Sequence, residues 1–393
     1  MELKLIFRKS RLNRSLYLLL VVFLLSCSTV LAQAIQSKTA SPAEDQLVVK
    51  AVGSTGEPQN VYLPIIERAP GKFFGIYLKQ YWNSENVNTY MPIADQAAGK
   101  KHSSVGWFID LEDDAFTIPV TDLPKNNLYR QLEELWKAGY VSFINLGTNA
   151  TAGQIINGDR DQYISYAAEF YKAWLDLGND RIAMIAPLQE MNGTWTEYGK
   201  ASSSNEIIQA YRYIINVFYQ KGVRRDQVWW VFAPNGWNPP ESPERMFENY
   251  YPGDDVVDFV GFSSYNYGFC PATAGISGKW ESYPEIFEPY INRMKAMAPS
   301  KPVIIAETAT TSYYKNGVPD EAMKNQWLIK NYNDLASNPA VVGIYYFNFT
   351  EFDGYACDFG VVQEDNFSSG YRDGVANSRY DYLTARGIGY YVR

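Results

Sequence analysis

Eight short apolar runs alternate with helical patterns from residue 73 onward, and this alternation constrains the fold more than any other feature of the chain. Most of the runs lack polar alternation, as expected of parallel strands that are buried on both faces. Strands that are regularly separated by helices favour a parallel sheet. The runs are FFGIYL (73–78), SVGWFIDL (104–111), YVSFINLG (140–147), IAMIAPLQE (182–190), VWWVFAPN (228–235), VDFVGFSSYN (257–266), PVIIAETA (302–309) and VVGIYYFN (341–348).

Helical periodicity fills the segments between these runs. Gly139 and Gly222 follow two of the patterns and are predicted to end those helices. The five patterns are LYRQLEELWKAG (128–139), YISYAAEFYKAWLDLG (163–178), SNEIIQAYRYIINVFYQKG (204–222), EIFEPYINRMKAM (285–297) and MKNQWLIKNYNDLAS (323–337). Eight strands with helices between them predict an α/β fold, a (β/α)8 TIM barrel over residues 71–393. A doubly wound open sheet is the alternative, although no G-x-G-x-x-G or Walker pattern follows the first strand.

The first 70 residues differ in character from the rest. Lys4, Arg8, Lys9, Arg11 and Arg14 precede the apolar run LYLLLVVFLL, and small residues follow it. This order is typical of a secretory signal peptide, predicted over residues 1–34 with cleavage near Ala34. Cys27 in LLSC offers a second possibility, a lipoprotein anchor. Residues 35–70 are predicted to be a linker or docking segment.

Charge and residue types narrow the range of partners. The full chain carries 35 basic and 43 acidic residues, and removal of residues 1–34 takes away five basic residues and one acid, which leaves a formal charge of −12. That charge disfavours nucleic acid and anionic lipid as partners. His102 is the only histidine, so a zinc site is not expected, and a calcium site is only weakly signalled. We expect no cofactor and no resident metal, an exported protein with no membrane span after cleavage, and a monomer.

The predicted strands end in polar residues. In a barrel of this type, the active site is built at the carboxyl ends of the strands. Glu190 and Glu307 each follow an otherwise apolar run and lie 117 residues apart, on the fourth and seventh strands. Two carboxylates that face one cleft are what glycoside hydrolysis requires, one as proton donor and the other as nucleophile. Aromatic rings would stack on sugar faces, and amide or hydroxyl groups would bind sugar hydroxyls.

Two other interpretations stay open at this point. The acids of IDLEDD, including Asp110 and Glu112, form a competing carboxylate cluster, although a solvated loop would explain them as well. Cys270 and Cys357, the two cysteines that remain after cleavage, are either bridged or two free buried thiols.

Several motifs resemble one known family. IAPLQEMNGTW (185–195) is similar to the R-P-L-H-E-M-N-G segment of glycoside hydrolase family 26, the β-mannanase family, and KPVIIAETA (301–309) to its nucleophile strand. VWWVFAPNGW (228–237) and YYPGDDVVDFVGFSSYN (250–266) resemble its fifth and sixth strands. The resemblance covers residues 70–350 and implies a retaining enzyme on a (β/α)8 barrel, with Glu190 as acid/base, Glu307 as nucleophile and Tyr265 orienting the nucleophile.

Two departures from the family pattern concern the sugar. Gln189 stands where the family usually has histidine, and the eighth strand offers Tyr345, Tyr346 and Phe347 where the family often has tryptophan. We therefore expect an endo-acting enzyme on a mannan-, glucan- or xylan-like β-linked polysaccharide without naming the sugar. A catalytically silent carbohydrate-binding barrel is the alternative, and an exported scaffold is a third interpretation. The candidate substrate-binding residues are Gln189, Asn192, Trp195, Asn235, Trp237, Tyr265 and Tyr346.

Overall fold

The computed structural model describes residues 48–52, 58–62, 71–78, 87–237, 242–271, 278–350, 357–363 and 366–392. The chain divides into two units, residues 1–69 and 70–393. In the first unit, β1 (Val48–Val52) and β2 (Pro58–Tyr62) pair as an antiparallel hairpin. The hairpin lies within residues 35–70, for which the sequence predicts a linker or docking segment and no strands. The predicted signal peptide (1–34), its cleavage site and the possible lipid anchor at Cys27 lie outside the described residues.

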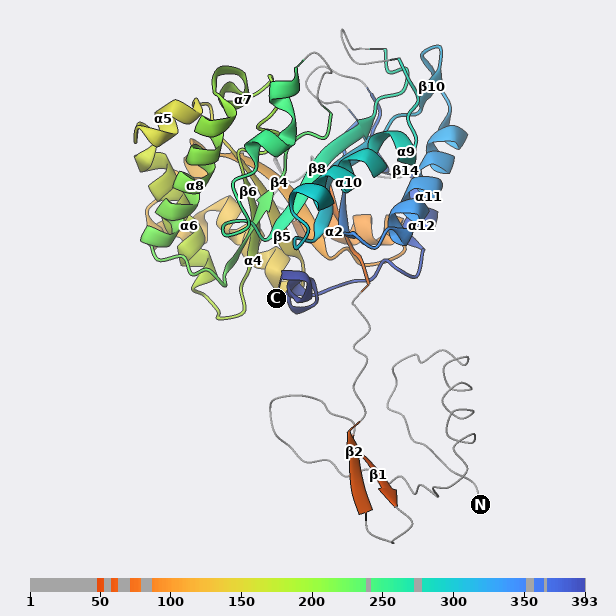
Figure 1. Ribbon diagram of the computed structural model, residues 1–393, viewed down its shortest axis with the longest axis horizontal. Helices are drawn as coiled ribbons and strands as arrows, with labels where there is room; N and C mark the ends of the chain where they lie inside the picture. Colours follow the sequence, from red (N-terminus) through yellow and green to blue (C-terminus); the bar gives the residue numbers. More distant parts are fainter. Residues whose placement is uncertain are drawn as a thin grey trace. The chain divides into compact units, whose positions relative to one another are not determined.

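A closed barrel of eight parallel strands forms the second unit (Figure 1). The strands follow one another around the barrel in chain order, and the last one pairs with the first. All eight predicted strands are present, so the (β/α)8 prediction is confirmed and the open-sheet alternative is wrong. The strands are β3 (Phe73–Leu78), β4 (Ser104–Asp110), β5 (Val141–Gly147), β6 (Ala183–Pro187), β7 (Val228–Phe232), β8 (Phe259–Asn266), β9 (Val303–Thr310) and β12 (Val341–Asn348).

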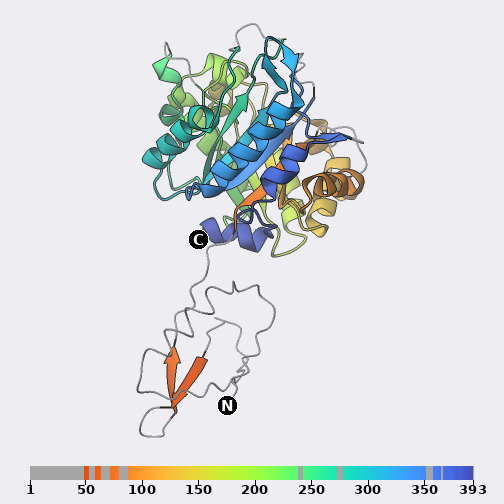
Figure 2. The ribbon, with the colours of Figure 1, turned by 90° about the vertical axis from the view of Figure 1, so that its right-hand side faces the viewer.

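Helices cover the outside of the barrel, and four of the five predicted ones are confirmed as single helices, whereas the segment 285–297 is divided at Phe287 into α9 and α10. Ser203 and Glu206 form a capping box that starts α8, and Gly222, at φ 91°, follows its last turn. Figure 2 shows α11 running along the barrel wall beside α12. The main helices are α2 (Val87–Ala98), α4 (Asn127–Lys137), α6 (Asp161–Leu175), α8 (Ser204–Gln220), α10 (Glu288–Met297), α11 (Glu321–Ser337) and α12 (Ser369–Val375). Shorter helices are α3 (Asp114–Thr117), α5 (Ala152–Ile156), α7 (Glu197–Ala201), α9 (Tyr283–Ile286) and α13 (Ala385–Gly389).

Aromatic rings fill the barrel interior. The Tyr345 ring lies against Gly75 and the Tyr77 ring against Gly106, where a Cβ atom would come within 2.5 Å and 2.2 Å of the rings. Glycine at these positions therefore makes room for the tyrosines in the closed barrel. No helix in the described part of the chain is long and apolar enough to cross a bilayer.

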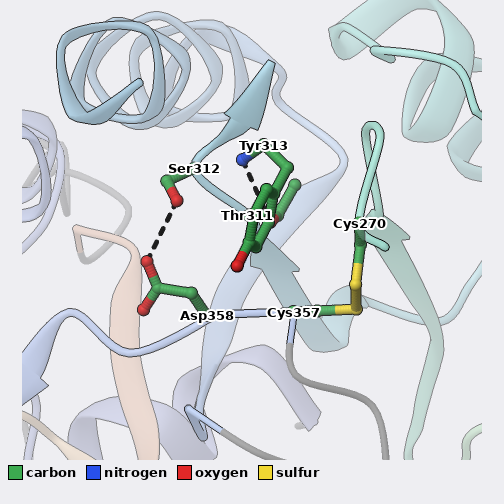
Figure 3. The surroundings of a disulfide bond; sticks show 6 residues. All are labelled: Cys270, Thr311, Ser312, Tyr313, Cys357 and Asp358. Atoms are coloured by element: carbon green, nitrogen blue, oxygen red, sulfur yellow. Dashed lines mark hydrogen bonds between the residues drawn. A yellow bond between two sulfur atoms is a disulfide. The ribbon is translucent and has the colours of Figure 1, made fainter. Parts of the chain in front are cut away.

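One covalent cross-link joins two loops of the barrel unit. Cys270, after β8, is bonded to Cys357, after β12, and the two positions are 87 residues apart (Figure 3). The bridged alternative for this pair is therefore confirmed, and the free-thiol alternative is wrong.

Candidate active site

Glu190 lies in a turn that directly follows β6. Leu188 and Glu190 adopt left-handed backbone angles, φ 55° and 51°, which are uncommon for residues other than glycine. The amide of Glu190 donates to the carbonyl of Ala233 at 2.8 Å, which ties the turn to the end of β7. Strained backbone of this kind persists only where the surroundings fix it, and it concentrates at functional sites.

Three side chains donate hydrogen bonds to the Glu190 carboxylate. Trp195 Nε1 donates to Oε2 at 2.7 Å, Asn235 Nδ2 donates to Oε1 at 2.8 Å, and the Ser263 hydroxyl also donates to Oε1. Gly193 permits the first of these contacts, because a Cβ atom there would lie 2.4 Å from the Trp195 ring. The carboxylate is thus held in one orientation by groups from three neighbouring segments.

Glu307 lies within β9 and is only 4% exposed. Tyr265 donates its hydroxyl proton to Oε2 at 2.5 Å, and Asn145 Nδ2 donates to Oε1 at 3.0 Å. Asn145 also donates to the Tyr77 hydroxyl at 3.0 Å, which in turn donates to the carbonyl of Ala306. A network from β3, β5 and β8 therefore fixes the Glu307 carboxylate.

The two carboxylates belong to one site. Ser263 pairs in register with Glu307 across β8 and β9, and its hydroxyl reaches Glu190. Burial and then the negative charge of Glu190 raise the pKa of the Glu307 carboxyl well above its usual value, while the hydrogen bonds from Tyr265 and Asn145 oppose that shift. Burial and the charges of Glu307 and Glu190 also raise the pKa of Tyr265, which keeps it a proton donor. The charge of Glu190 thus affects the protonation of Glu307, which places the two acids in one electrostatic environment.

Aromatic side chains surround this pair. Trp195 and Trp237 are each 54% exposed, which leaves their rings available for stacking. The backbone amide of Trp237 donates to Asn235 Oδ1 at 3.0 Å, so one asparagine links this tryptophan to Glu190. Beside the Tyr265 ring lies Phe347 at 5.7 Å, itself stacked on Phe349 at 4.1 Å. The result is an aromatic wall next to two acids.

Two predicted substrate-binding residues are placed away from the open site. Tyr346 is fully buried and donates to the carbonyl of Phe359, with its ring against Tyr371 of α12. Because side chains alternate along β12, Tyr345 and Phe347 point into the barrel and Tyr346 points out to the helices. Phe347, which contacts Tyr265, is therefore the β12 ring on the side of the two acids, and it is 2% exposed.

Asn192, the second of these residues, is 2% exposed and bonded to backbone. Its Nδ2 donates to the carbonyls of Asn235 and Arg245, and its Oδ1 accepts from the amide of Asn235. Arg245 completes the bracing, because its guanidinium donates to the carbonyls of Asn192, Gly193 and Gly199. Asn192 thus holds the loop that bears Glu190 and has no atom free for a substrate.

Gln189 lies between the two left-handed residues and is half-buried. Its backbone carbonyl accepts from Tyr198 at 2.8 Å. Its side-chain Oε1 is buried without a hydrogen-bond partner among the residues that the structure describes. That oxygen is suited to accept a hydrogen bond from a bound ligand.

The competing acids of IDLEDD have other partners. Glu112 accepts from Thr148 at 2.6 Å and from the amide of Asn149, and it pairs with Arg160 at 3.3 Å. Asp110 ends β4, and partial desolvation of its carboxyl, followed by the negative charges of Glu112 and Asp113, raises its pKa. Within the described ranges, no group of three or more His, Cys, Asp or Glu side chains could hold a metal ion.

Residues that the sequence did not single out complete the site. Ser263 and Tyr265 lie two apart on β8 and so share a face, which is a signal that could have indicated Ser263. Tyr77 and Arg245 carry no comparable signal, because the first lies in an apolar strand and the second in a short 3-10 helix.

Comparison with known proteins places the chain among carbohydrate-active enzymes. A sequence model described as Glycosyl hydrolase family 26 matches residues 124–340. Endoglucanase H of Acetivibrio thermocellus is 28% identical over 206 residues, which are 51% of this chain and 21% of that protein, so the match spans about a fifth of the relative's length.

Solved structures share the fold. The catalytic domain of the family 26 endo-β-1,4-mannanase from Bacillus sp. JAMB-750 superposes with a TM-score of 0.56 at 17% identity, covering 82% of this chain and 90% of that one. A β-mannanase from a symbiotic protist of the termite Reticulitermes speratus, complexed with gluco-manno-oligosaccharide, gives 0.53 at 16% identity, covering 81% and 90%. At these identities the likeness concerns the fold.

Proposed function

Since the chain belongs to glycoside hydrolase family 26, we propose that it is an exported, retaining endo-β-glycosidase that cleaves a β-linked polysaccharide. Glu307 is the nucleophile and Glu190 the acid/base. The observation that supports this most strongly is the pair of carboxylates itself, each held by its own set of donors and linked through Ser263.

In the first step, a Glu307 oxygen attacks the anomeric carbon, and the bond to the leaving oxygen breaks as Glu190 gives that oxygen its proton. A covalent glycosyl ester forms on Glu307. In the second step, Glu190 takes a proton from water, the water oxygen attacks the anomeric carbon, and the ester bond breaks to restore both carboxyl groups. Two inversions give net retention, for which we predict a carboxyl separation of about 5–5.5 Å.

Proton placement follows from the surroundings of each acid. Glu307 must be ionised to attack, although burial and the charge of Glu190 both raise its pKa. When Glu190 carries the proton, its charge is absent, and the donors Tyr265 and Asn145 favour the Glu307 carboxylate. The first step therefore requires the proton on Glu190 and the negative charge on Glu307.

Substrate binding is assigned to groups around the acids. Trp195 and Trp237 offer exposed rings for sugar faces, and Gln189 offers an amide oxygen without a partner to a hydroxyl group. Asn235 lies beside them with its amide bonded to Glu190, Ser263 and the Trp237 backbone, so a substrate hydroxyl would bind it by sharing or replacing one of these bonds. The compared proteins are described as mannanases and an endoglucanase, which supports a mannan- or glucan-like chain as substrate. A xylan-like chain is the further member of the class to be tested.

The test is a panel of mannan, mixed-linkage β-glucan, β-1,3-xylan and bacterial exopolysaccharides, read by product size and by NMR of the first anomer released. Oligosaccharides with the β configuration are expected early. Glu190→Gln and Glu307→Gln should each remove turnover, whereas Glu288→Gln, at an exposed carboxylate on α10, should not. Binding without any product in a long incubation would contradict the proposal and favour a carbohydrate-binding barrel.

A further inference from the structure

Phe359 lies against the flat face of Tyr265. The two ring centroids are 5.8 Å apart with an interplanar angle of 20°, and Phe359 also meets Tyr267 edge-on at 5.5 Å. Phe359 is 1% exposed. The Tyr265 hydroxyl donates to Glu307. Phe359 therefore packs against the ring whose orientation sets the direction of this hydrogen bond.

Lys324 of α11 holds the backbone on both sides of Phe359. Its ammonium donates to the carbonyl of Asp358 at 2.7 Å and to that of Gly360 at 2.8 Å, and it lies 3.7 Å from the Asp358 carboxylate. Lys324 is 1% exposed, so these bonds are shielded from water. Asp358 adopts φ 47°, a left-handed conformation that its surroundings must maintain.

Neighbouring elements fix the same residues further. Ser312, just after β9, donates to the Asp358 carboxylate at 3.1 Å (Figure 3). Phe359 donates its amide to the carbonyl of Phe349 at 3.0 Å, and its own carbonyl accepts from Tyr346 at 2.7 Å. This bond gives buried Tyr346 a function in holding Phe359.

The disulfide closes the arrangement covalently. Cys357 lies two residues before Phe359, and Cys270 lies five residues after Tyr265. The Cys270–Cys357 bond therefore joins the segment that carries one ring of the stack to the segment that carries the other (Figure 3). Nothing in the proposed reaction uses Phe359, Lys324 or the cysteines directly.

We propose that Phe359 is a positioning residue for Glu307, acting through Tyr265, and that the Cys270–Cys357 disulfide and Lys324 keep it against that tyrosine. The inference rests on the proposed function only where Glu307 is called the nucleophile. The titratable groups that interact electrostatically with Glu307 are Glu190, Tyr265, Tyr77 and Tyr198. Without the Phe359 ring packed against it, the Tyr265 ring would orient its hydroxyl less precisely toward Glu307. Small misplacements of catalytic groups lower the reaction rate steeply.

Phe359→Leu in the full chain tests this, because it keeps apolar volume and removes the flat face. The turnover number should fall about 10- to 100-fold with a KM change below about twofold. The NMR titration of the Glu307 carboxyl should move to higher pH, since the Tyr265 hydrogen bond lowers its pKa. Reduction of the disulfide in the wild-type protein should likewise lower the turnover number and move the Glu307 titration to higher pH. The double variant Cys270→Ala/Cys357→Ala should show both changes without reductant, and reductant should not change it further.

Phe218→Leu is the matched control, because it makes the same change at a buried ring of α8 that packs on Trp230. An unchanged Glu307 titration in both Phe359→Leu and the reduced protein would overturn the proposal, as would an equal effect of Phe218→Leu. Absence of glycan hydrolysis by the wild-type protein would instead refute the proposed function. The titration needs no substrate, so it still decides the role of Phe359.

Discussion

Removal of the Cys270–Cys357 bond should destabilise the barrel unit by an amount set by the length of the loop that it closes. The cross-linked positions are 87 residues apart. In the chain-entropy treatment, a loop of this length removes about 15 cal/mol/K from the unfolded chain, or about 4.6 kcal/mol at 25 °C, and measured effects are typically about 2–4 kcal/mol. Residues 70–393 form the unit concerned. At about 2.1 cal/mol/K of unfolding entropy per residue, the midpoint should fall by roughly 3–7 °C.

Calorimetry and urea unfolding of three variants measure this: Cys270→Ala, Cys357→Ala and the double substitution. Each single variant already lacks the cross-link. The free energy of unfolding of the double variant should therefore lie within about 0.5 kcal/mol of that of either single variant. Reductant should lower the midpoint of the wild-type protein and leave that of the double variant unchanged. If the losses of unfolding free energy in the two single variants added up in the double variant, the cross-link would not be their cause. Each cysteine side chain would then stabilise the protein through its own packing.

Three further outcomes follow from the site. Tyr265→Phe removes a hydrogen-bond donor that lowers the Glu307 pKa. The acidic limb of the kcat/KM profile, which rises as Glu307 ionises, should therefore move to higher pH. A pH-rate profile in which this limb did not move would contradict the assignment. Trp237→Ala should raise KM by roughly 5- to 30-fold with little change in kcat, because it removes about 1–2 kcal/mol of stacking on the exposed ring. Steady-state kinetics that showed a loss of kcat alone would contradict a role in substrate binding. Asn192→Ala should cost about 1–3 kcal/mol in urea unfolding, because it removes the side-chain partner of part-buried backbone groups of Asn235 and Arg245; full stability with weaker substrate binding would show direct contact instead.

The fold was predictable because the barrel strands are buried on both faces and therefore stand out as apolar runs. The same property hid which face of each strand points inward. Along β12, alternation separates Tyr346 from Tyr345 and Phe347, but all three are apolar enough for either side. The choice of Tyr346 for the site was thus not decided by the pattern, and in the structure Phe347 is the residue of β12 whose ring contacts Tyr265.

The two acids could be found because a carboxylate that ends an apolar strand needs a partner or a use. The family resemblance drawn from the motifs around them is confirmed. Their supporting residues were harder to see. Phe359 stacks on Tyr265 from a loop and Lys324 bonds to the carbonyls of that loop, and contacts of these kinds have no sequence period. Asn192 looked like a ligand because polar strand-end residues line such sites, yet its amide is used entirely by backbone.

In the proposed reaction, Glu307 forms a covalent bond to the sugar while Glu190 supplies the proton. Incubation with an activated 2-deoxy-2-fluoro β-glycoside, followed by peptide mass spectrometry, would detect that bond. We expect one added fluoroglycosyl group on the peptide that contains Glu307, and none in Glu307→Gln. Label on Glu190 or Asp110, or hydrolysis that releases the α-anomer first without any covalent adduct, would contradict it.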